Sequence, residues 1–152
     1  MFERFAPSTR SAVESGLAEA RLAGDRRIGT DHLLLGMLHD PRVAEALATD
    51  AAAARAARSA LDNRALAAVG IDAGTFRAPS LRAGITRAPF TSGSRTVLSR
   101  TLEHTVTEHA RAIQPKHLLM ALLEREQPDP AAALLAELGV DRSTAHRRAE
   151  TL

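Results

Sequence analysis

The segment IGTDHLLLGML, residues 28–38, places a histidine between an acid and a run of leucines, where a helix is expected to begin. A second segment of the same pattern, IQPKHLLMALL, occupies residues 113–123. His32 and His117 hold the same place in the two segments, 85 positions apart. A pattern that returns at a fixed offset is typical of a fold in which one supersecondary unit is used twice.

The offset of 85 holds outside these segments as well. Phe5 corresponds to Phe90, and Ile28 corresponds to Ile113. Near the end of each unit the best match shifts to an offset of 69, which aligns LAAVGID (66–72) with LAELGVD (135–141). We interpret the difference as an insertion of about four helical turns in the first unit, mostly the alanine-rich residues 49–64.

Apolar residues recur with helical spacing along nearly the whole chain, and no alternating pattern of a strand is present. Prolines and glycines without a sustained period favour a linker at residues 73–89. We therefore predict an all-α fold and a single domain, residues 1–152, made of two pseudo-symmetric four-helix repeats at 1–72 and 90–152. In the first unit we expect one helix near residues 8–23, a second that begins near 30, a third that begins near 43 and a fourth that ends at 70. In the second unit we expect helices at 92–110, 115–126, 130–138 and 141–152.

Composition excludes several classes of function. The chain has no cysteine, which excludes disulfides, thiolate nucleophiles and cysteine metal sites and fits a reducing compartment. Its net charge is only +2, and Lys116 is its single lysine. The high pI of about 10.3 therefore reflects arginine, which does not titrate near neutral pH, and we expect no nucleic-acid partner.

The sequence also carries no membrane or catalytic signature. No apolar run approaches the ~20 residues of a membrane span, and the N-terminus lacks the apolar core of a signal peptide. No G-x-S-x-G motif, H-E-x-x-H motif or paired-carboxylate pattern is present. We therefore expect a soluble, cytoplasmic protein that is not an enzyme, with no catalytic residue, no metal and no cofactor.

Several motifs together resemble one known family. MFERF at the N-terminus, IGTDHLLLGML, PFT (89–91), KHLLMALL (116–123) and LLAELGVD (134–141) resemble the N-terminal domain of Clp-family unfoldases, and the ClpC type most of all. The likeness extends over nearly the whole chain. In that family the domain is a mobile module ahead of an ATPase ring, and it binds adaptor proteins and substrates.

The resemblance implies a stand-alone, non-catalytic protein-binding module that modulates Clp-dependent proteolysis. A phosphate-binding loop needs Gly-Lys-Ser/Thr, and the single lysine here is followed by His117, so this sequence contains no ATPase ring. The implied partners are adaptor or substrate proteins, a full-length ClpC unfoldase and cyclic peptides. The alternative function is a decoy that sequesters cyclic-peptide antibiotics aimed at the ClpC N-domain.

The resemblance also implies candidate site residues. In the family an acid precedes the histidine in both units and helps to hold the guanidinium of phosphoarginine. Asp31 keeps this charge, although an acid there also suits the first turn of a helix. Lys116 reverses it, and a lysine cannot accept hydrogen bonds from a guanidinium. Phosphoarginine binding is therefore doubtful in the second unit, and both interpretations of Asp31 stay open.

Phe2, Phe90 and Arg95 stand at positions that match the family's cyclic-peptide site. An apolar patch with one cation suits a hydrophobic peptide ring, whereas burial in the core is the simpler interpretation of the phenylalanines. His32 and His117 allow acid–base catalysis or metal ligation. Their repetition at one structural place favours instead a hydrogen-bonding role that fixes the packing of each repeat.

Overall fold

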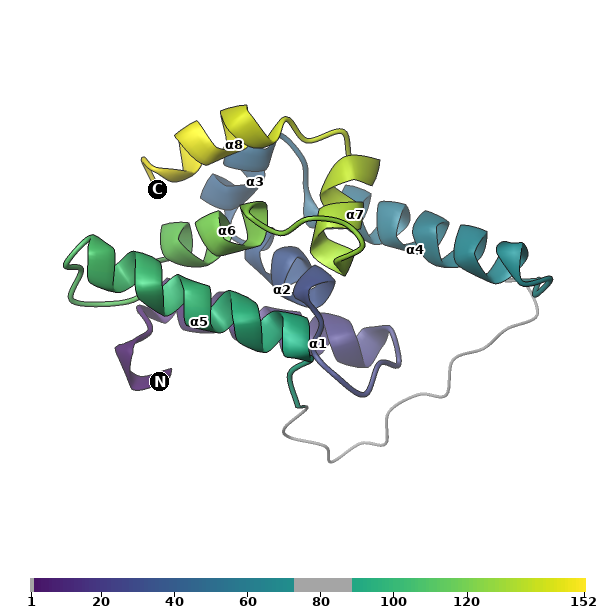
Figure 1. The fold of residues 1–152 in the computed structure, drawn as a ribbon, viewed down its shortest axis with the longest axis horizontal. Coiled ribbons are helices and arrows are strands. Elements are labelled where there is room, and N and C mark those ends of the chain that lie inside the picture. Colours follow the sequence, from purple (N-terminus) through teal and green to yellow (C-terminus); the bar gives the residue numbers. More distant parts are fainter. Residues whose placement is uncertain (1, 73–88) are drawn as a thin grey trace.

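The structure is a computed structural model that describes residues 2–72 and 89–152, and this part of the chain is all-helical, as predicted (Figure 1). The linker predicted at 73–89 lies, apart from Pro89, outside the described residues. A short 3-10 helix, η1 (Phe2–Arg4), precedes the α-helices. These are α1 (Pro7–Leu22), α2 (Thr30–Met37), α3 (Pro41–Leu47), α4 (Ala51–Ala68), α5 (Ser92–Thr107), α6 (Pro115–Leu123), α7 (Pro130–Glu137) and α8 (Arg142–Ala149).

Short polar side chains define where most of these helices begin. A carboxylate or hydroxyl at the N-cap accepts a hydrogen bond from a backbone N–H of the first turn, which satisfies a donor that the helix itself leaves free. The capping residues are Asp40 of α3, Asp50 of α4, Thr91 of α5, Asp129 of α7 and Asp141 of α8. Proline at the first position of α1, α3, α6 and α7 adds a second start signal.

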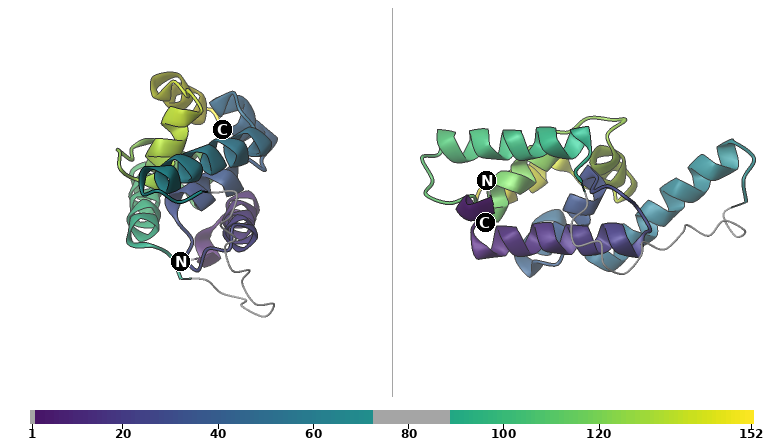
Figure 2. Two further views of the ribbon diagram at one scale, coloured as in Figure 1. Left: turned by 90° about the vertical axis from the view of Figure 1, so that its right-hand side faces the viewer. Right: turned by 90° about the horizontal axis from the view of Figure 1, so that it is seen from below.

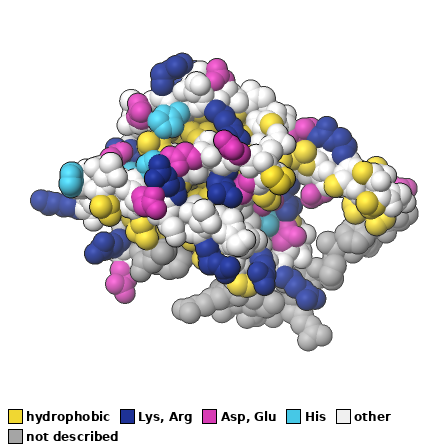
Figure 3. Space-filling view, in the orientation of Figure 1, with side chains coloured by type: hydrophobic (Ala, Val, Ile, Leu, Met, Phe, Trp, Pro, Cys, Tyr) yellow, Lys and Arg dark blue, Asp and Glu magenta, His cyan; other side chains and the backbone are white. Residues whose placement is uncertain are grey.

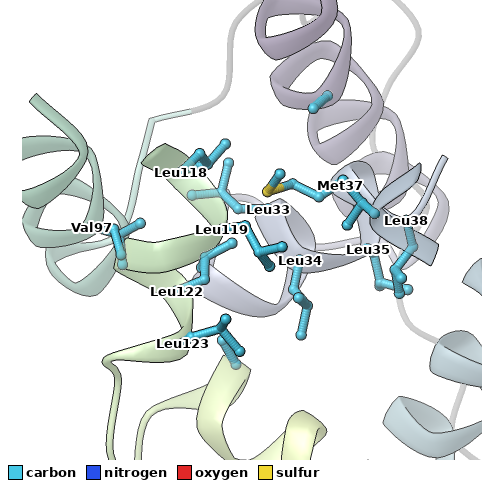
Figure 4. Packing of buried hydrophobic residues seen from close by; sticks show 14 of the residues in the cluster. Leu33, Leu34, Leu35, Met37, Leu38, Val97, Leu118, Leu119, Leu122 and Leu123 are labelled. Atoms are coloured by element: carbon cyan, nitrogen blue, oxygen red, sulfur yellow. The ribbon is translucent and has the colours of Figure 1, made fainter. Parts of the chain in front are cut away.

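The hydrophobic core lies between the second helices of the two units. All eight residues of α2 are buried, and so are Leu118, Leu119 and Leu122 of α6. Leu33 and Leu34 of α2 lie close to these leucines of α6 (Figure 4). Burying one such side chain stabilises the fold by about 1.5–3 kcal/mol. The two leucine runs that mark the repeat in the sequence therefore form one shared core.

Two short backbone pairings join the units, and they are related by the same offset of 85. Phe5 pairs with Ile113, and Ile28 pairs with Phe90, each as an isolated parallel bridge. Each bridge links the residues before the first helix of one unit to the residues before the second helix of the other. The units therefore exchange equivalent contacts, as the subunits of a two-fold symmetric dimer do.

Two hydroxyl groups form a second pair of equivalent hydrogen bonds between the units. Thr9 Oγ1 donates to the carbonyl of Ile113 at 2.7 Å, and Ser94 Oγ donates to the carbonyl of Ile28 at 2.8 Å. Thr9 and Ser94 are both fully buried. They are again 85 positions apart, so the pseudo-two-fold symmetry extends to individual hydrogen bonds.

The predicted alignment of the two unit ends is wrong. LAAVGID ends the fourth helix of its unit, α4, whereas LAELGVD ends the third helix of its unit, α7. The true correspondence aligns Asp50 with Asp141, because both cap a fourth helix. Ala48 and Gly139, which precede these caps, both have positive φ angles, 52° and 67°. The turn was missed because an alanine, and not the usual glycine, adopts this conformation in the first unit.

With this correspondence, the extra residues of the first unit lie in a different place from the one predicted. It lies at the C-terminal end of α4, which has 18 residues where α8 has 8, and not in an insertion centred on 49–64. That end of α4 projects away from the other helices in Figure 1 and in the right-hand view of Figure 2.

The two helix pairs that should be equivalent differ in how closely they pack. A Cβ atom at Gly36 of α2 would lie 2.2 Å from the carbonyl oxygen of Ala12 and 2.4 Å from the backbone nitrogen of Gly16, both in α1. The equivalent of Gly36 in α6 is Ala121, whose methyl group is buried. Only the first unit therefore requires glycine at this position.

We predict that Gly36→Ala destabilises the protein by about 2 kcal/mol or more, because α1 and α2 must separate to admit the methyl group. Helix propensity alone predicts a gain of about 1 kcal/mol, so the sign of the change is diagnostic. Urea unfolding monitored by circular dichroism measures it. Ser99→Ala, at an exposed position of α5, is the control; a stability of Gly36→Ala equal to or above that of the wild type would contradict the close approach.

Candidate binding site at the starts of α2 and α6

The two histidines cap the helices that carry the core leucines. The backbone N–H of Gly29 donates to His32 Nδ1 at 2.8 Å, and that of Gln114 donates to His117 Nδ1 at 2.9 Å. Because Nδ1 accepts in both cases, the ring proton is assigned to Nε2. The side chain three residues into each helix thus closes the turn that precedes it.

The second ring nitrogen of each histidine faces a carboxylate. His32 Nε2 lies 2.8 Å from Asp25 Oδ2, and His117 Nε2 lies 3.1 Å from Glu108 Oε2. Both rings are buried, and both nitrogens of each ring are engaged within the chain. Within residues 2–72 and 89–152, no group of three or more His, Asp or Glu side chains is placed to hold a metal ion.

Asp31 is buried and carries an internal partner that the sequence analysis missed. Arg58 of α4 donates from Nε to Asp31 Oδ2 and from Nη2 to Asp25 Oδ2, both at 2.6 Å. Burial opposes the charge on Arg58, but the charge of Asp31 and their hydrogen bond outweigh it and raise the pKa of the guanidinium. An arginine of this chain therefore occupies the carboxylate at which the resemblance places phosphoarginine.

In the second unit, a nearby glutamate compensates the positive charge of Lys116. Lys116 Nζ lies 2.7 Å from Glu108 Oε2, the same oxygen that faces His117. The hydrogen bond with Lys116 lowers the pKa of Glu108 although partial burial opposes this. The acid that supports the histidine in this unit thus also compensates the lysine.

A glutamate–histidine pair occupies equivalent places in the two units, with the two residues exchanged between the helices. Glu19 of α1 lies 2.9 Å from His39 Nε2, and at the same offset His104 Nε2 of α5 lies 2.8 Å from Glu124. Only the Glu19 pair receives an arginine from α4, since Arg55 Nε donates to Glu19 Oε2 at 3.0 Å. This hydrogen bond lowers the pKa of Glu19 against the opposing effect of burial.

Of the three residues predicted for the cyclic-peptide surface, the structure describes the side chains of Phe90 and Arg95. Arg95 is exposed, and its Nη1 donates to the backbone carbonyl of Phe90 at 3.3 Å, so these two residues are adjacent. Phe90 is partly buried against the core. The side chain of Phe2 lies outside the described part of the chain. The 3-10 helix that contains Phe2 adjoins the Ile113 bridge, while Phe90 belongs to the other bridge.

Asp129 is another buried acid that the sequence analysis missed. Its carboxylate accepts hydrogen bonds from Thr30 Oγ1 at 2.7 Å, from the backbone of Ala131 at 3.0 Å and from Arg125 Nε at 3.0 Å. It thereby ties the start of α2 to the start of α7. The Asp-Pro dipeptide before α7 was a recognisable capping signal, but the contact with Thr30, 99 positions away, left no local trace.

The surface mixes charges of both signs over the helices, while hydrophobic side chains gather near the projecting end of α4 (Figure 3). Val69 and Ile71, just after α4, are 71% and 42% exposed. No helix among the described residues is long and apolar enough to cross a membrane.

A comparison with solved structures found a match over nearly the full length. The N-terminal domain of the caseinolytic protease associated chaperone ClpD from Arabidopsis thaliana superimposes with a TM-score of 0.75 and 22% sequence identity, over 99% of this chain and 98% of that chain. This chain has the fold of a Clp N-terminal domain. A comparison with protein-family models found no match, and a comparison with curated proteins found none. The Clp N-terminal fold thus rests on the arrangement of the helices and agrees with the double repeat.

We predict that Glu19→Gln lowers the free energy of unfolding at pH 7 by about 1–2 kcal/mol, because it leaves Arg55 without its charged partner. The lowered pKa of Glu19 means that its contribution is complete above the ordinary value of 4.5 and is lost as the pH falls through the folded-state pKa. The difference between variant and wild type should therefore shrink below pH 4.5 in urea unfolding. Glu45→Gln, at an exposed site, is the control; a pH-independent difference would contradict the linkage.

Proposed function

We propose that this chain is a non-catalytic protein- or peptide-binding module that resembles the N-domain of Clp unfoldases, binds adaptors, substrates or peptides, and thereby modulates Clp-dependent proteolysis. The observation that carries this proposal is the Clp N-terminal fold, which spans essentially the whole of both compared chains. Since a fold alone does not establish a function, the binding role also has to be argued from the described side chains.

The described side chains favour binding over chemistry. Both capping histidines use both ring nitrogens, and the buried acids Glu19, Asp31 and Asp129 are paired with arginines of the chain. A general base needs a free position from which it can reach a substrate proton. We include a cytoplasmic location in the proposal, on the basis of a composition without cysteine.

The proposal predicts that the added protein changes degradation by a ClpC–protease pair. Because it would share adaptors or substrates with the unfoldase, the rate of substrate breakdown should change as its concentration rises above that of the ring. Loss of a fluorescent substrate measures this rate. An equal excess of an unrelated folded protein is the control; an unchanged rate over a large excess of the wild type would contradict the accessory role.

The second candidate function is the decoy for cyclic-peptide antibiotics. The contact between the exposed Arg95 and the Phe90 carbonyl favours it, because it holds a cation at the backbone of a partly buried phenylalanine. A phosphoarginine site at Asp31 is the weaker proposal, because Arg58 would have to leave the carboxylate and Lys116 replaces the second acid.

The decoy role predicts calorimetrically detectable binding of a ClpC-directed cyclic peptide. Phe90→Ala and Phe2→Ala should each weaken the affinity by about tenfold, the usual effect of removing a central aromatic anchor. Val106→Ala, which removes an exposed apolar side chain of α5, is the control. Unchanged affinity in both phenylalanine variants would rule out this site.

A further inference from the structure

The loop between α1 and α2 separates an acid from the arginines that follow it. The carboxylate of Asp25 lies 2.8 Å from His32 Nε2 and accepts a hydrogen bond from Arg58, so it is engaged within the chain. Arg26 and Arg27 come next in the sequence, and both are exposed. The acid of this loop therefore serves contacts inside the fold and leaves its two neighbouring arginines uncompensated.

The loop between α5 and α6 is built in the same way. Glu108 Oε2 contacts both Lys116 and His117. Arg111 follows in the same loop and is exposed. At the offset of 85, Arg111 is the equivalent of Arg26, so both units direct the loop acid to the capping histidine and leave an arginine in solvent.

Two exposed arginines flank the first of the two backbone bridges. Arg4 immediately precedes Phe5, and its carbonyl accepts from the N–H of Ile113 at 2.8 Å. Arg111 precedes Ile113 by two positions, so the two arginines start from paired backbone segments. Glu3, which is also exposed, lowers the positive charge of this group.

Three exposed arginines flank the second bridge. Arg26 and Arg27 immediately precede Ile28, which pairs with Phe90. Arg95 Nη1 donates to the carbonyl of Phe90, so this guanidinium lies at the same bridge. The second group is therefore more positive than the first. We call the members of both groups the bridge arginines: Arg4, Arg26, Arg27, Arg95 and Arg111.

None of the bridge arginines forms an ion pair within residues 2–72 and 89–152. The arginines of this part of the chain that do so are Arg42, Arg55, Arg58, Arg64, Arg100 and Arg125. Like charges gathered in one place repel one another, and they raise the local concentration of molecules of the opposite charge. The bridge arginines are thus available to carboxylates from outside the chain, which a guanidinium binds through two parallel hydrogen bonds.

The fold holds the two groups at a fixed separation. The first group precedes α1 and the second follows it, so the 16 residues of this helix separate them by about 24 Å. α1 and α5 run alongside one another over this distance (Figure 2, right). Because each group is attached to a backbone bridge, its position is set by the contact between the units.

We propose that the bridge arginines bind an acidic segment of a partner protein, in which two groups of carboxylates lie about 24 Å apart. This deepens the proposed function as a protein-binding module, on which it rests, by naming the chemistry of a partner. In an extended segment the two acidic groups are separated by about seven residues. Charge complementarity of this kind sets the partner's orientation and its rate of association.

A fluorescent synthetic peptide tests the proposal by anisotropy; it carries three glutamates at each end of a glycine–serine spacer of about seven residues. Arg26→Gln with Arg27→Gln should weaken its binding to the full chain by about tenfold, since each exposed ion pair contributes up to about 1 kcal/mol. Arg111→Gln should weaken it by about threefold. Arg147→Gln with Arg148→Gln, an exposed arginine pair on α8, is the matched control and should bind like the wild type.

A peptide with a two-residue spacer should bind about threefold more weakly, because it cannot reach both groups. No binding at about 0.05 M sodium chloride, equal weakening by the α8 control, or equally tight binding of a single-stranded oligonucleotide of the same charge would overturn the proposal. Each of these results leaves the degradation and cyclic-peptide assays unaffected.

Circular dichroism shows whether each variant folds. If one does not, the amide resonances of the wild type decide in a titration with the same peptide. Resonances of the loops at residues 24–29 and 108–114 should shift while those of α8 do not. Shifts confined to α8, or spread evenly over the chain, would refute the proposal.

Discussion

The fold depends on one exchange of hydrogen bonds between the two units. The carbonyl of Ile113 accepts from the backbone of Ala6 and from the hydroxyl of Thr9, and the carbonyl of Ile28 accepts from Thr91 and Ser94 in the same way. These carbonyls are buried and would be costly to leave unpaired. They hold the start of each unit against the middle of the other, and that position brings the leucines of α2 and α6 together.

The repeat and its leucine runs were sufficient to predict an all-α double repeat, because helical periodicity and capping residues are local signals. The end of the first unit was not predictable in this way. Ala48 adopts a left-handed conformation that alanine rarely takes, so the sequence lacks the glycine that marks the same turn at Gly139. The similar ends LAAVGID and LAELGVD then produced a plausible but incorrect alignment.

The candidate site was predictable in part for a related reason. His32 and His117 could be singled out because they repeat, and Asp31 because the resemblance implies an acid before the histidine; their places at helix starts follow from spacing. Arg58 could not, because it lies in an alanine-rich segment without periodic signal and reaches Asp31 only through the packing of α4 on α2. Long-range charge pairing of this kind has no signature in a single sequence.

The mutual bridges make the halves of this molecule dependent on each other during synthesis. When the first four helices have left the ribosome, Ile28 still lacks the backbone of Pro89 and Thr91, and Arg4 and Ala6 still await Ile113. Nascent chains of this protein therefore do not complete the first half before the second has emerged as far as Ile113. By the same reasoning, two fragments severed between residues 73 and 88 would hold complementary halves of one hydrogen-bonding scheme.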